Sequence, residues 1–183
     1  MEKSHRKVRM LTEGAVCIAL AEILSFIPLY KMPWGGSVDL AMLTIILYCV
    51  RWGFGAGMVA SFAHAVLQML FEGGIAIGWQ SIIGDFIVAY SVLGLAGLFK
   101  GNFFLGTVVA CVARFLVHYV VGATIWAEYM PETFFNMTMT TPWIYSALYN
   151  AAYMLTDMVV ILVIGAILMK TPAKKYITGQ DLA

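Results

Sequence analysis

The sequence predicts an all-α polytopic membrane protein, a bundle of six transmembrane helices with both termini in the cytoplasm. Three observations support this fold class. Of the 183 residues, 62% are hydrophobic, and apolar residues dominate almost continuously from Leu11 to Met169. A soluble domain of this length could not bury so many apolar side chains. Nine of the eleven Lys and Arg residues flank the apolar segments at ends that would share one side of a membrane. The length allows one domain, residues 1–183.

Six apolar segments are expected to cross the membrane. The second has roughly 13 residues where about 20 are needed for about 30 Å of hydrocarbon, so we expect it to be tilted, deeply buried or extended by the polar segment before it. A basic region like that of a signal peptide precedes the first segment, but no A-x-A cleavage site follows, so this segment should be retained. The expected spans are Val8–Tyr30, Val38–Val50, Phe54–Phe71, Gln80–Phe99, Phe103–Ile125 and Pro142–Met169.

Orientation follows from the positive charges, because cytoplasmic ends of membrane helices are enriched in Lys and Arg. The charges that place both termini in the cytoplasm are Lys3, Arg6, Lys7, Arg9, Arg51, Lys100, Lys170, Lys174 and Lys175. The opposite loops carry acids and aromatic residues, namely Asp39, Glu72, Glu128, Glu132, Trp34, Trp79, Trp126, Tyr129 and Trp143, together with Lys31. Aromatic belts are common at membrane interfaces. Aromatic faces beside carboxylates also suit an aromatic cation, because each ring attracts positive charge by about 0.5 to 2 kcal/mol.

Arg114 and His118 are polar residues inside the fifth span, and their spacing of four places them on one helix face. Arg114 should face the bundle interior, because exposure to lipid costs at least about 2.5 kcal/mol. Its expected partner is a carboxylate, with Asp157 favoured for a structural ion pair and Glu22 as the other candidate. Asn150 lies on the same stripe of its helix as Asp157 but nearer the outer surface, which favours a ligand contact.

The remaining polar positions favour binding over catalysis. His64 stands alone on an apolar face and is expected to pack in the core. The sequence has no H-E-x-x-H, G-x-S-x-G, Walker A or Cys-x-x-Cys pattern, so no catalytic residue, metal or cofactor is expected. Asp85 and Asp157 could suggest an intramembrane aspartyl protease, but the extra glycine before Gly84-Asp85 is missing. No solvated basic stripe is present for nucleic acid.

Several motifs together resemble a known family. They are the segment Arg9–Ala21, Val38-Asp39, Arg51-Trp-Gly53, Asp85 with the following VAYSVLGLAGLF, Arg114-x-x-x-His118 with Trp126 eight residues on, and Tyr145 with Asn150. This set, spread over nearly the whole chain, is similar to the thiamine-specific S component of energy-coupling-factor vitamin transporters. The resemblance implies a high-affinity vitamin-binding protein in a prokaryotic plasma membrane. Such a protein has no ATPase of its own and works with a transmembrane coupling subunit and two ATP-binding subunits.

The resemblance also implies roles for individual residues. The aminopyrimidine of thiamine would lie against Trp126, and Trp34 would face the thiazolium. Hydrogen bonds and charges would come from Asp39, Asp85, Arg114, His118, Tyr145 and Asn150. Ala15 and Ala19 match an Ala-x-x-x-Ala motif that contacts the coupling subunit, because small residues four apart let helices approach closely. Packing inside the bundle is the alternative role for these two alanines.

Four departures from the family pattern bear on the ligand. Asp85 stands where the family usually has glutamate, Phe86 replaces a tyrosine, Arg114 replaces a lysine, and the loop Glu72–Gly78 lacks a His or Tyr. A shorter carboxylate and a lost hydroxyl could favour a pyrimidine precursor or a B6 vitamer, with Glu72 compensating near the cation. A membrane lipid enzyme and a scaffold subunit without a ligand are the alternatives from other classes. Neither explains aromatic residues clustered beside carboxylates.

Overall fold

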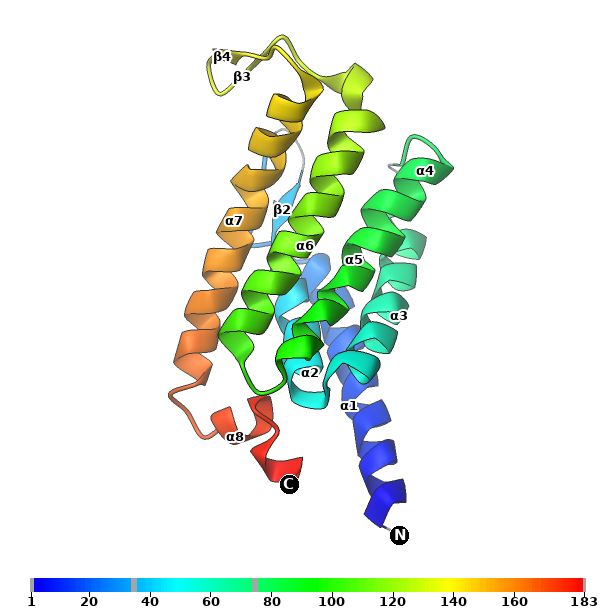
Figure 1. Cartoon of the computed structure of the whole chain (residues 1–183), viewed down its shortest axis with the longest axis vertical. Coiled ribbons are helices and arrows are strands. Elements are labelled where there is room, and N and C mark those ends of the chain that lie inside the picture. Colours follow the sequence, from blue (N-terminus) through cyan, green and yellow to red (C-terminus); the bar gives the residue numbers. More distant parts are fainter. Residues whose placement is uncertain (1, 34–35, 74–75, 183) are drawn as a thin grey trace.

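The computed structural model describes residues 2–33, 36–73 and 76–182. Over these ranges the chain forms one bundle of helices, with both termini at the same end and the β3–β4 hairpin (Thr133–Phe134 with Met137–Thr138) at the other (Figure 1). The bundle helices are α1 (Glu2–Ser25), α2 (Ala41–Trp52), α3 (Phe54–Glu72), the composite helix Trp79–Phe99, α6 (Phe103–Thr124) and α7 (Pro142–Leu168). The all-α membrane bundle predicted from the sequence is therefore confirmed.

Four of these helices are long and apolar enough to cross a membrane: α3, Trp79–Phe99, α6 and α7. The composite helix changes type along its length. It comprises α4 (Trp79–Ser81), the π-helical η2 (Ile82–Val88), α5 (Ala89–Ser91) and the 3₁₀-helical η3 (Val92–Phe99). After α7 come the short α8 (Lys174–Ile177) and η5 (Gln180–Leu182), and η4 (Ala127–Tyr129) follows α6.

The predicted limits of the first two spans were wrong. α1 ends at Ser25, five residues before the expected Tyr30, because Pro28 lacks an amide hydrogen and disfavours helix at the residue before it. Beyond it, β1 (Tyr30–Lys31) pairs antiparallel with β2 (Ser37–Val38), so Val38 lies in a strand and not in the second helix. α2 begins only at Ala41, whose amide donates to Asp39 Oδ1 at 2.9 Å.

α2 lies at the centre of the bundle. Met42, Ile45, Ile46, Cys49 and Val50 are each 1% exposed or less, and their neighbours come from α1, α6, α7 and η3. Of the three alternatives expected for this short segment, deep burial is the one that the structure shows. A helix of 12 residues can stay inside the bilayer region here because its neighbours, and not lipid, surround it.

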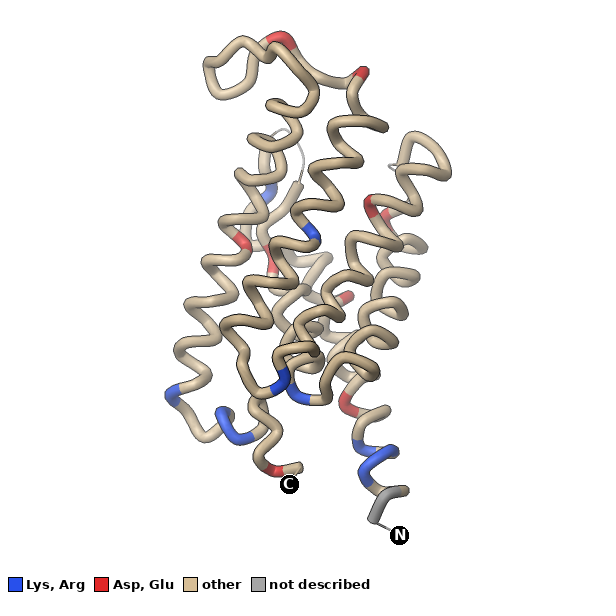
Figure 2. The backbone as a smooth tube through the Cα atoms, in the orientation of Figure 1, with Lys and Arg blue, Asp and Glu red and all other residues tan. Residues whose placement is uncertain are grey.

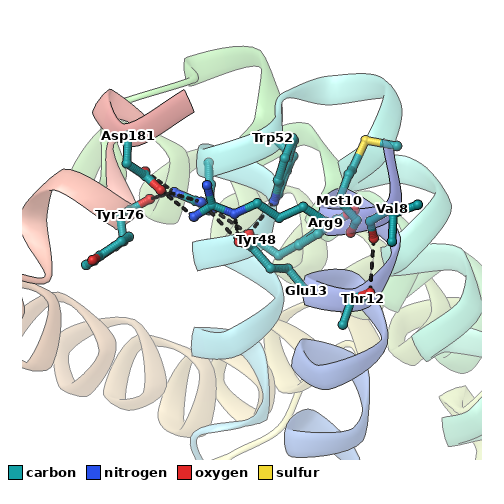
Figure 3. A network of polar contacts seen from close by, with 10 residues as sticks. Val8, Arg9, Met10, Thr12, Glu13, Tyr48, Trp52, Tyr176 and Asp181 are labelled. Atoms are coloured by element: carbon teal, nitrogen blue, oxygen red, sulfur yellow. Dashed lines mark hydrogen bonds and ion pairs between the residues drawn. The ribbon is translucent and has the colours of Figure 1, made fainter. Parts of the chain in front are cut away.

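The termini end of the bundle holds most of the Lys and Arg residues, whereas Asp and Glu dominate toward the other end (Figure 2). Arg51 is the centre of an ion-pair network there. Figure 3 labels its partners Glu13, Tyr176 and Asp181. The guanidinium of Arg51 donates to Glu13 at 2.6 and 3.1 Å and to Asp181 at 2.6 and 3.0 Å, and it also donates to the carbonyl of Tyr176. Arg9 pairs with Glu13 at 2.8 Å and with Asp181. The network ties α1, α2 and the C-terminal segment together.

Close packing of α6 on α7 positions the other end of the bundle. A Cβ added at Gly122 of α6 would lie 2.4 Å from Ser146 Oγ of α7, so any larger residue would displace the Ser146 hydroxyl. The close approach lets Ser146 Oγ donate to the carbonyl of Tyr119 at 2.8 Å and Asn150 Nδ2 to that of His118 at 3.3 Å. These bonds fix the halves of α6 and α7 that lie away from the termini relative to each other.

Candidate ligand-binding site

A cavity of about 790 Å³ lies in the half of the bundle away from the termini. Its volume is within the range of about 300 to 1,000 Å³ that is typical of small-molecule sites. The walls come from the end of α1, the β1–β2 hairpin, α2, α3, η2, α6 and α7. Among the described residues, four carboxylates and two cations line it, a formal excess of two negative charges. The polar and charged residues in the lining include Ser25, Lys31, Asp39, Gln68, Glu72, Asp85, Arg114, His118, Ser146, Asn150 and Asp157.

Asp85 is the most highly connected carboxylate of the cavity. It lies in the π-helical turn η2, a feature often found at functional sites. Its Oδ2 accepts hydrogen bonds from Ser81 Oγ at 2.8 Å and from Trp126 Nε1 at 2.7 Å, and its Oδ1 faces His118 Nδ1 at 3.0 Å. Each carboxylate oxygen has two acceptor positions, so Oδ1 retains one for a ligand N–H.

Arg114, His118 and Asp85 form a chain of hydrogen bonds in which the protons are donated from Arg114 toward Asp85. Arg114 Nε donates to His118 Nε2 at 3.4 Å, which requires a lone pair on that ring nitrogen. The proton of a neutral His118 must then be on Nδ1, where it is donated to Asp85. The guanidinium of Arg114 also lies 4.1 Å from the ring centre of Tyr90, a cation–π contact. Arg114 therefore orients the ring of His118 from within the cavity lining.

The preferred partner of Arg114 was predicted wrongly. No ion pair joins Arg114 to Asp157, which instead accepts the backbone N–H of Asp39 through Oδ1 at 2.9 Å. Glu22, the other candidate, is bound to His64 Nδ1 at 2.6 Å and to Gln68 Nε2 at 2.9 Å. The charge of Arg114 is balanced by the ring face of Tyr90 and by the field of the surrounding carboxylates. The spacing of residues in the sequence did not predict that Arg114 would be buried without a carboxylate in contact with it.

The α7 residues predicted for the site line the cavity and differ in what they offer. Asn150 is 4% exposed, and its amide is engaged: Nδ2 donates to Ser146 and His118 oxygens, and Oδ1 accepts from Tyr153 at 2.9 Å. Tyr145 packs edge-on against Phe134 at 5.2 Å, and the structure gives its hydroxyl no hydrogen-bond partner among the described residues. Tyr145 is free to bond a ligand, whereas Asn150 braces His118.

The aromatic residues predicted for the outer side fall into two groups, one that lines the cavity and one that does not. Trp126 lines the cavity, while Trp79 is 68% exposed and Trp143 is 44% exposed, outside the cavity lining. Trp34 lies outside the described residues. Asp39 lines the cavity, but its oxygens accept from Ser37 Oγ at 3.1 Å and from the Ala41 amide, so it shapes its own loop.

A polar stripe on α3 was missed as a part of the site, apart from Glu72, which was expected near the cation. His64, Gln68 and Glu72 follow one another at intervals of four and so share one helix face. His64 is buried, as expected, but it is paired with Glu22, and Gln68 and Glu72 line the cavity. The spacing of three polar residues in an otherwise apolar helix was the available signal.

Ala15 and Ala19 lie on the exposed face of α1, far from the cavity and away from the bundle core. Internal packing, the alternative for these residues, is therefore wrong. Their exposure leaves this face of α1 free for contact with lipid or another protein.

Comparison with known proteins identifies the family. A model of the thiamine transporter protein family (Thia_YuaJ) matches residues 11–177, nearly the whole chain. The chain belongs to this family. The thiamine transporter family consists of transport proteins and not of enzymes, in agreement with the sequence prediction.

Individual members of the thiamine transporter family are similar over their full length. The thiamine transporter ThiT of Bacillus subtilis is 28% identical over 189 residues, with 93% of this chain and 95% of the relative covered. ThiT of Lacticaseibacillus paracasei is 23% identical over 201 residues, covering 98% and 95%. A solved structure of ThiT from Listeria monocytogenes has a TM-score of 0.79 at 25% identity, covering 93% of this chain and 98% of that one.

Proposed function

We propose that this chain is the thiamine-binding S component of an energy-coupling-factor importer in a prokaryotic plasma membrane. The observation that carries the proposal is the Asp85–His118–Trp126 cluster, which faces a cavity with excess negative charge. Thiamine joins an aminopyrimidine, which offers N–H groups and a flat ring, to a cationic thiazolium. Family membership and the likeness to ThiT proteins support the same ligand.

The aminopyrimidine fits the Asp85 end of the cavity. The free acceptor position on Asp85 Oδ1 can take an N–H of the exocyclic amine, and Trp126 offers an aromatic face for the ring. Tyr145 supplies a free hydroxyl on the α7 side. Arg114 and Asn150 act indirectly, because both are bonded to His118. In this assignment the ligand-binding residues implied by the family resemblance line one cavity. The exception is Trp34, whose role stays a proposal.

The site is built for binding and not for energy conversion, so uptake needs partners. We assign coupling to a transmembrane subunit that docks on Ala15 and Ala19 and is driven by two ATP-binding subunits. The basic termini end then faces the cytoplasm and the cavity faces outward, as the positive-inside rule favours.

Titration of the purified protein tests the ligand. Tryptophan fluorescence should quench on thiamine addition, and Trp126→Ala should lose both the quench and about 1 to 3 kcal/mol of binding free energy, the usual contribution of a stacked ring. Trp52→Phe is the control, because Trp52 bonds Glu13 at the opposite end of the bundle. Tighter binding of hydroxymethylpyrimidine or pyridoxine than of thiamine would reassign the vitamer, and binding of none of the three would refute the proposal.

A further inference from the structure

A groove of about 480 Å³ lies at the termini end of the bundle, away from the ligand cavity. It is bounded by α1, α2 and α8, and most of its walls are apolar. The apolar and aromatic side chains in these walls include Val16, Leu47, Tyr48, Tyr176 and Ile177. Val16 is 53% exposed and Tyr176 is 47% exposed, so the groove opens outward, toward the surroundings of the bundle.

The groove has a charged end and an apolar end. Along α1 its lining runs from Arg9 to Cys17, a rise of about 12 Å. The charged lining residues Arg9, Glu13 and Arg51 lie toward the termini, whereas Cys17 and Leu47 lie deeper in the bundle. A phospholipid has the same polarity, because its phosphate stays at the membrane surface while its acyl chains point toward the membrane centre.

The α8 wall of the groove is held in place by α2. Arg51 of α2 donates a hydrogen bond to the carbonyl of Tyr176. Ile177, the next residue, is 7% exposed and belongs to the apolar core of the bundle. The groove is therefore part of the packed structure, although α8 itself has only four residues.

The mouth of the groove carries positive charge that no carboxylate balances. The network around Arg51 contains two arginines and two carboxylates, so it is neutral as a whole. Arg6 is exposed and lies three residues before Arg9 on the same side of α1. On the opposite wall, Lys175 Nζ lies 4.9 Å from the ring centre of Tyr176. Among the described residues, the ion pairs at this end have only Arg9 and Arg51 as cations.

We propose that this groove binds one anionic phospholipid, with an acyl chain along Val16 and Leu47 and the phosphate between Arg6 and Lys175. Basic pockets between membrane helices bind anionic headgroups on the cytoplasmic side, and this end is cytoplasmic in the orientation proposed above. A zwitterionic lipid gains less, because its own ammonium group already balances its phosphate. The site is separate from the vitamin cavity and adds a lipid partner to the proposed function.

Native mass spectrometry of the delipidated full-length protein in detergent tests the site. The two probes are dioleoyl phosphatidylglycerol and dioleoyl phosphatidylcholine, which have the same acyl chains and differ in net charge. One phosphatidylglycerol should bind about tenfold or more tightly than phosphatidylcholine, since each basic side chain near the headgroup contributes about fivefold. Equal affinities for the two lipids would overturn the proposal.

Charge substitutions distinguish the groove from the basic end as a whole. Arg6→Gln and Lys175→Gln should each weaken phosphatidylglycerol binding about fivefold. Lys170→Gln is the matched control, because Lys170 is exposed at the same end but lies outside the groove lining, and it should leave the affinity unchanged. An equal loss in Lys170→Gln and Lys175→Gln would assign the attraction to the whole basic end and would overturn the groove site.

Val16→Trp tests the acyl-chain part of the groove. The indole should occupy the space beside Leu47 and weaken phosphatidylglycerol binding about tenfold or more, whereas Val163→Trp on the exposed face of α7 should not. Unchanged affinity in Val16→Trp would place the lipid elsewhere. Thiamine affinity and melting temperature show that each variant is folded. Failure of the unaltered protein to bind thiamine would refute the proposed function and leave the lipid measurement valid.

Discussion

Asp85 has three polar neighbours and one vacant acceptor position, so its negative charge serves both the protein and a ligand. Asp85→Asn should weaken thiamine binding by about 1.5 to 3 kcal/mol, the range for a hydrogen bond to a charged group. Isothermal titration calorimetry on the detergent-solubilised variant measures this loss. The folded yield should remain, because Ser81 and Trp126 can still bond an amide oxygen. Wild-type affinity in a folded Asp85→Asn protein would remove the carboxylate from the site.

Asp157 acts through one oxygen, which accepts the backbone N–H of Asp39 at the start of α2. Asp157→Asn keeps a carbonyl oxygen there, so its thermal stability should stay close to that of the unaltered protein. Asp157→Ala leaves a buried donor unpaired and should cost about 1 to 3 kcal/mol.

Thermal unfolding of both variants in one detergent compares them directly. A large loss of stability in Asp157→Asn would show that the negative charge of Asp157 stabilises the fold. The ion pair with Arg114 that was expected from the sequence would have this consequence. Retained stability in Asp157→Ala would show that the bond to Asp39 is unimportant.

The spacing of residues along one helix predicted which side chains share a face of the site. It did not predict which side chains pair between helices. The four-residue interval of Arg114 and His118 correctly placed both on one face, and the structure brings them together with Asp85 and Trp126. The partner of Arg114 depends on the rotation of neighbouring helices, which apolar periodicity leaves open in a bundle that is hydrophobic all round. An aromatic face at Tyr90 was therefore overlooked in favour of a carboxylate.

Helix limits were predicted well where turns carry clear signals. Pro142 and the Gly53 turn mark the starts of α7 and α3, and Gly101 marks the gap before α6. The hairpins β1–β2 and β3–β4 were missed because two-residue strands leave no alternating pattern. The change from π-helix to 3₁₀-helix within Trp79–Phe99 is equally invisible to hydropathy, although it positions Asp85.

Gly97 in η3 lies directly against the turn between α2 and α3. A Cβ at this position would lie 2.6 Å from the Gly53 carbonyl carbon and from the Phe54 nitrogen, both backbone atoms that cannot rotate away. Gly97→Ala should therefore destabilise the bundle by about 1 to 3 kcal/mol, the usual cost of overpacking.

Gly55→Ala is the matched control for Gly97→Ala, because an added Cβ at Gly55 in α3 meets no atom within 4 Å. This substitution should stabilise the protein slightly, by up to about 1 kcal/mol, since alanine favours helix. Thermal unfolding in detergent should separate the two variants. Equal stability of the two alanine variants would contradict the packing argument.

The bundle class and the shared end of the termini follow from composition and from the placement of Lys and Arg. The same rule counted Arg51 as a cytoplasmic-side charge and did not predict its burial. Its side chain is 8% exposed and lies between Glu13 and Asp181. The positions of Lys and Arg in the sequence show which end of the bundle holds the cations, but they do not predict which residues these cations contact.

The Arg51 network should make stability depend on pH. Hydrogen bonds from Arg51 and Arg9 hold the pKa of Asp181 below its ordinary value of 3.8. A depressed pKa contributes stability that is complete above pH 3.8 and is lost as the pH falls from there toward the folded-state pKa. Asp181→Asn should melt at a lower temperature than the unaltered protein at pH 7, with a difference of about 0.5 to 1 kcal/mol.

Melting curves between pH 7 and pH 3 test this dependence on Asp181. The difference in melting temperature between the unaltered protein and Asp181→Asn should begin to shrink below about pH 4, where the Asp181 carboxyl of the unfolded chain takes up its proton. A gap that stays constant over this range would exclude the charge of Asp181 as its source.

The exposed face of α1 predicts that binding and uptake can be separated. Ala15→Trp should block uptake by holding a coupling partner away from α1, and it should leave thiamine affinity intact because the cavity lies at the other end of the helix. Val163→Trp on the exposed face of α7 is the control and should permit uptake. Radiolabelled uptake and binding are compared in the same cells. Loss of binding in Ala15→Trp would mean that the substitution disrupts the bundle.

The Arg51 network also imposes an order on biosynthesis. Glu13 is made before Arg51 and can pair with it as soon as α1 and α2 are together, whereas Asp181 is separated from Arg51 by 130 residues. Until α7 has been inserted, Arg51 can pair with one of its two carboxylate partners, Glu13, and not yet with Asp181. A nascent chain that stalls after α6 thus leaves Arg9 and Arg51 to share Glu13 at the membrane surface, one negative charge for two positive charges. The contact made by Asp181 supplies the second carboxylate once α7 has been inserted.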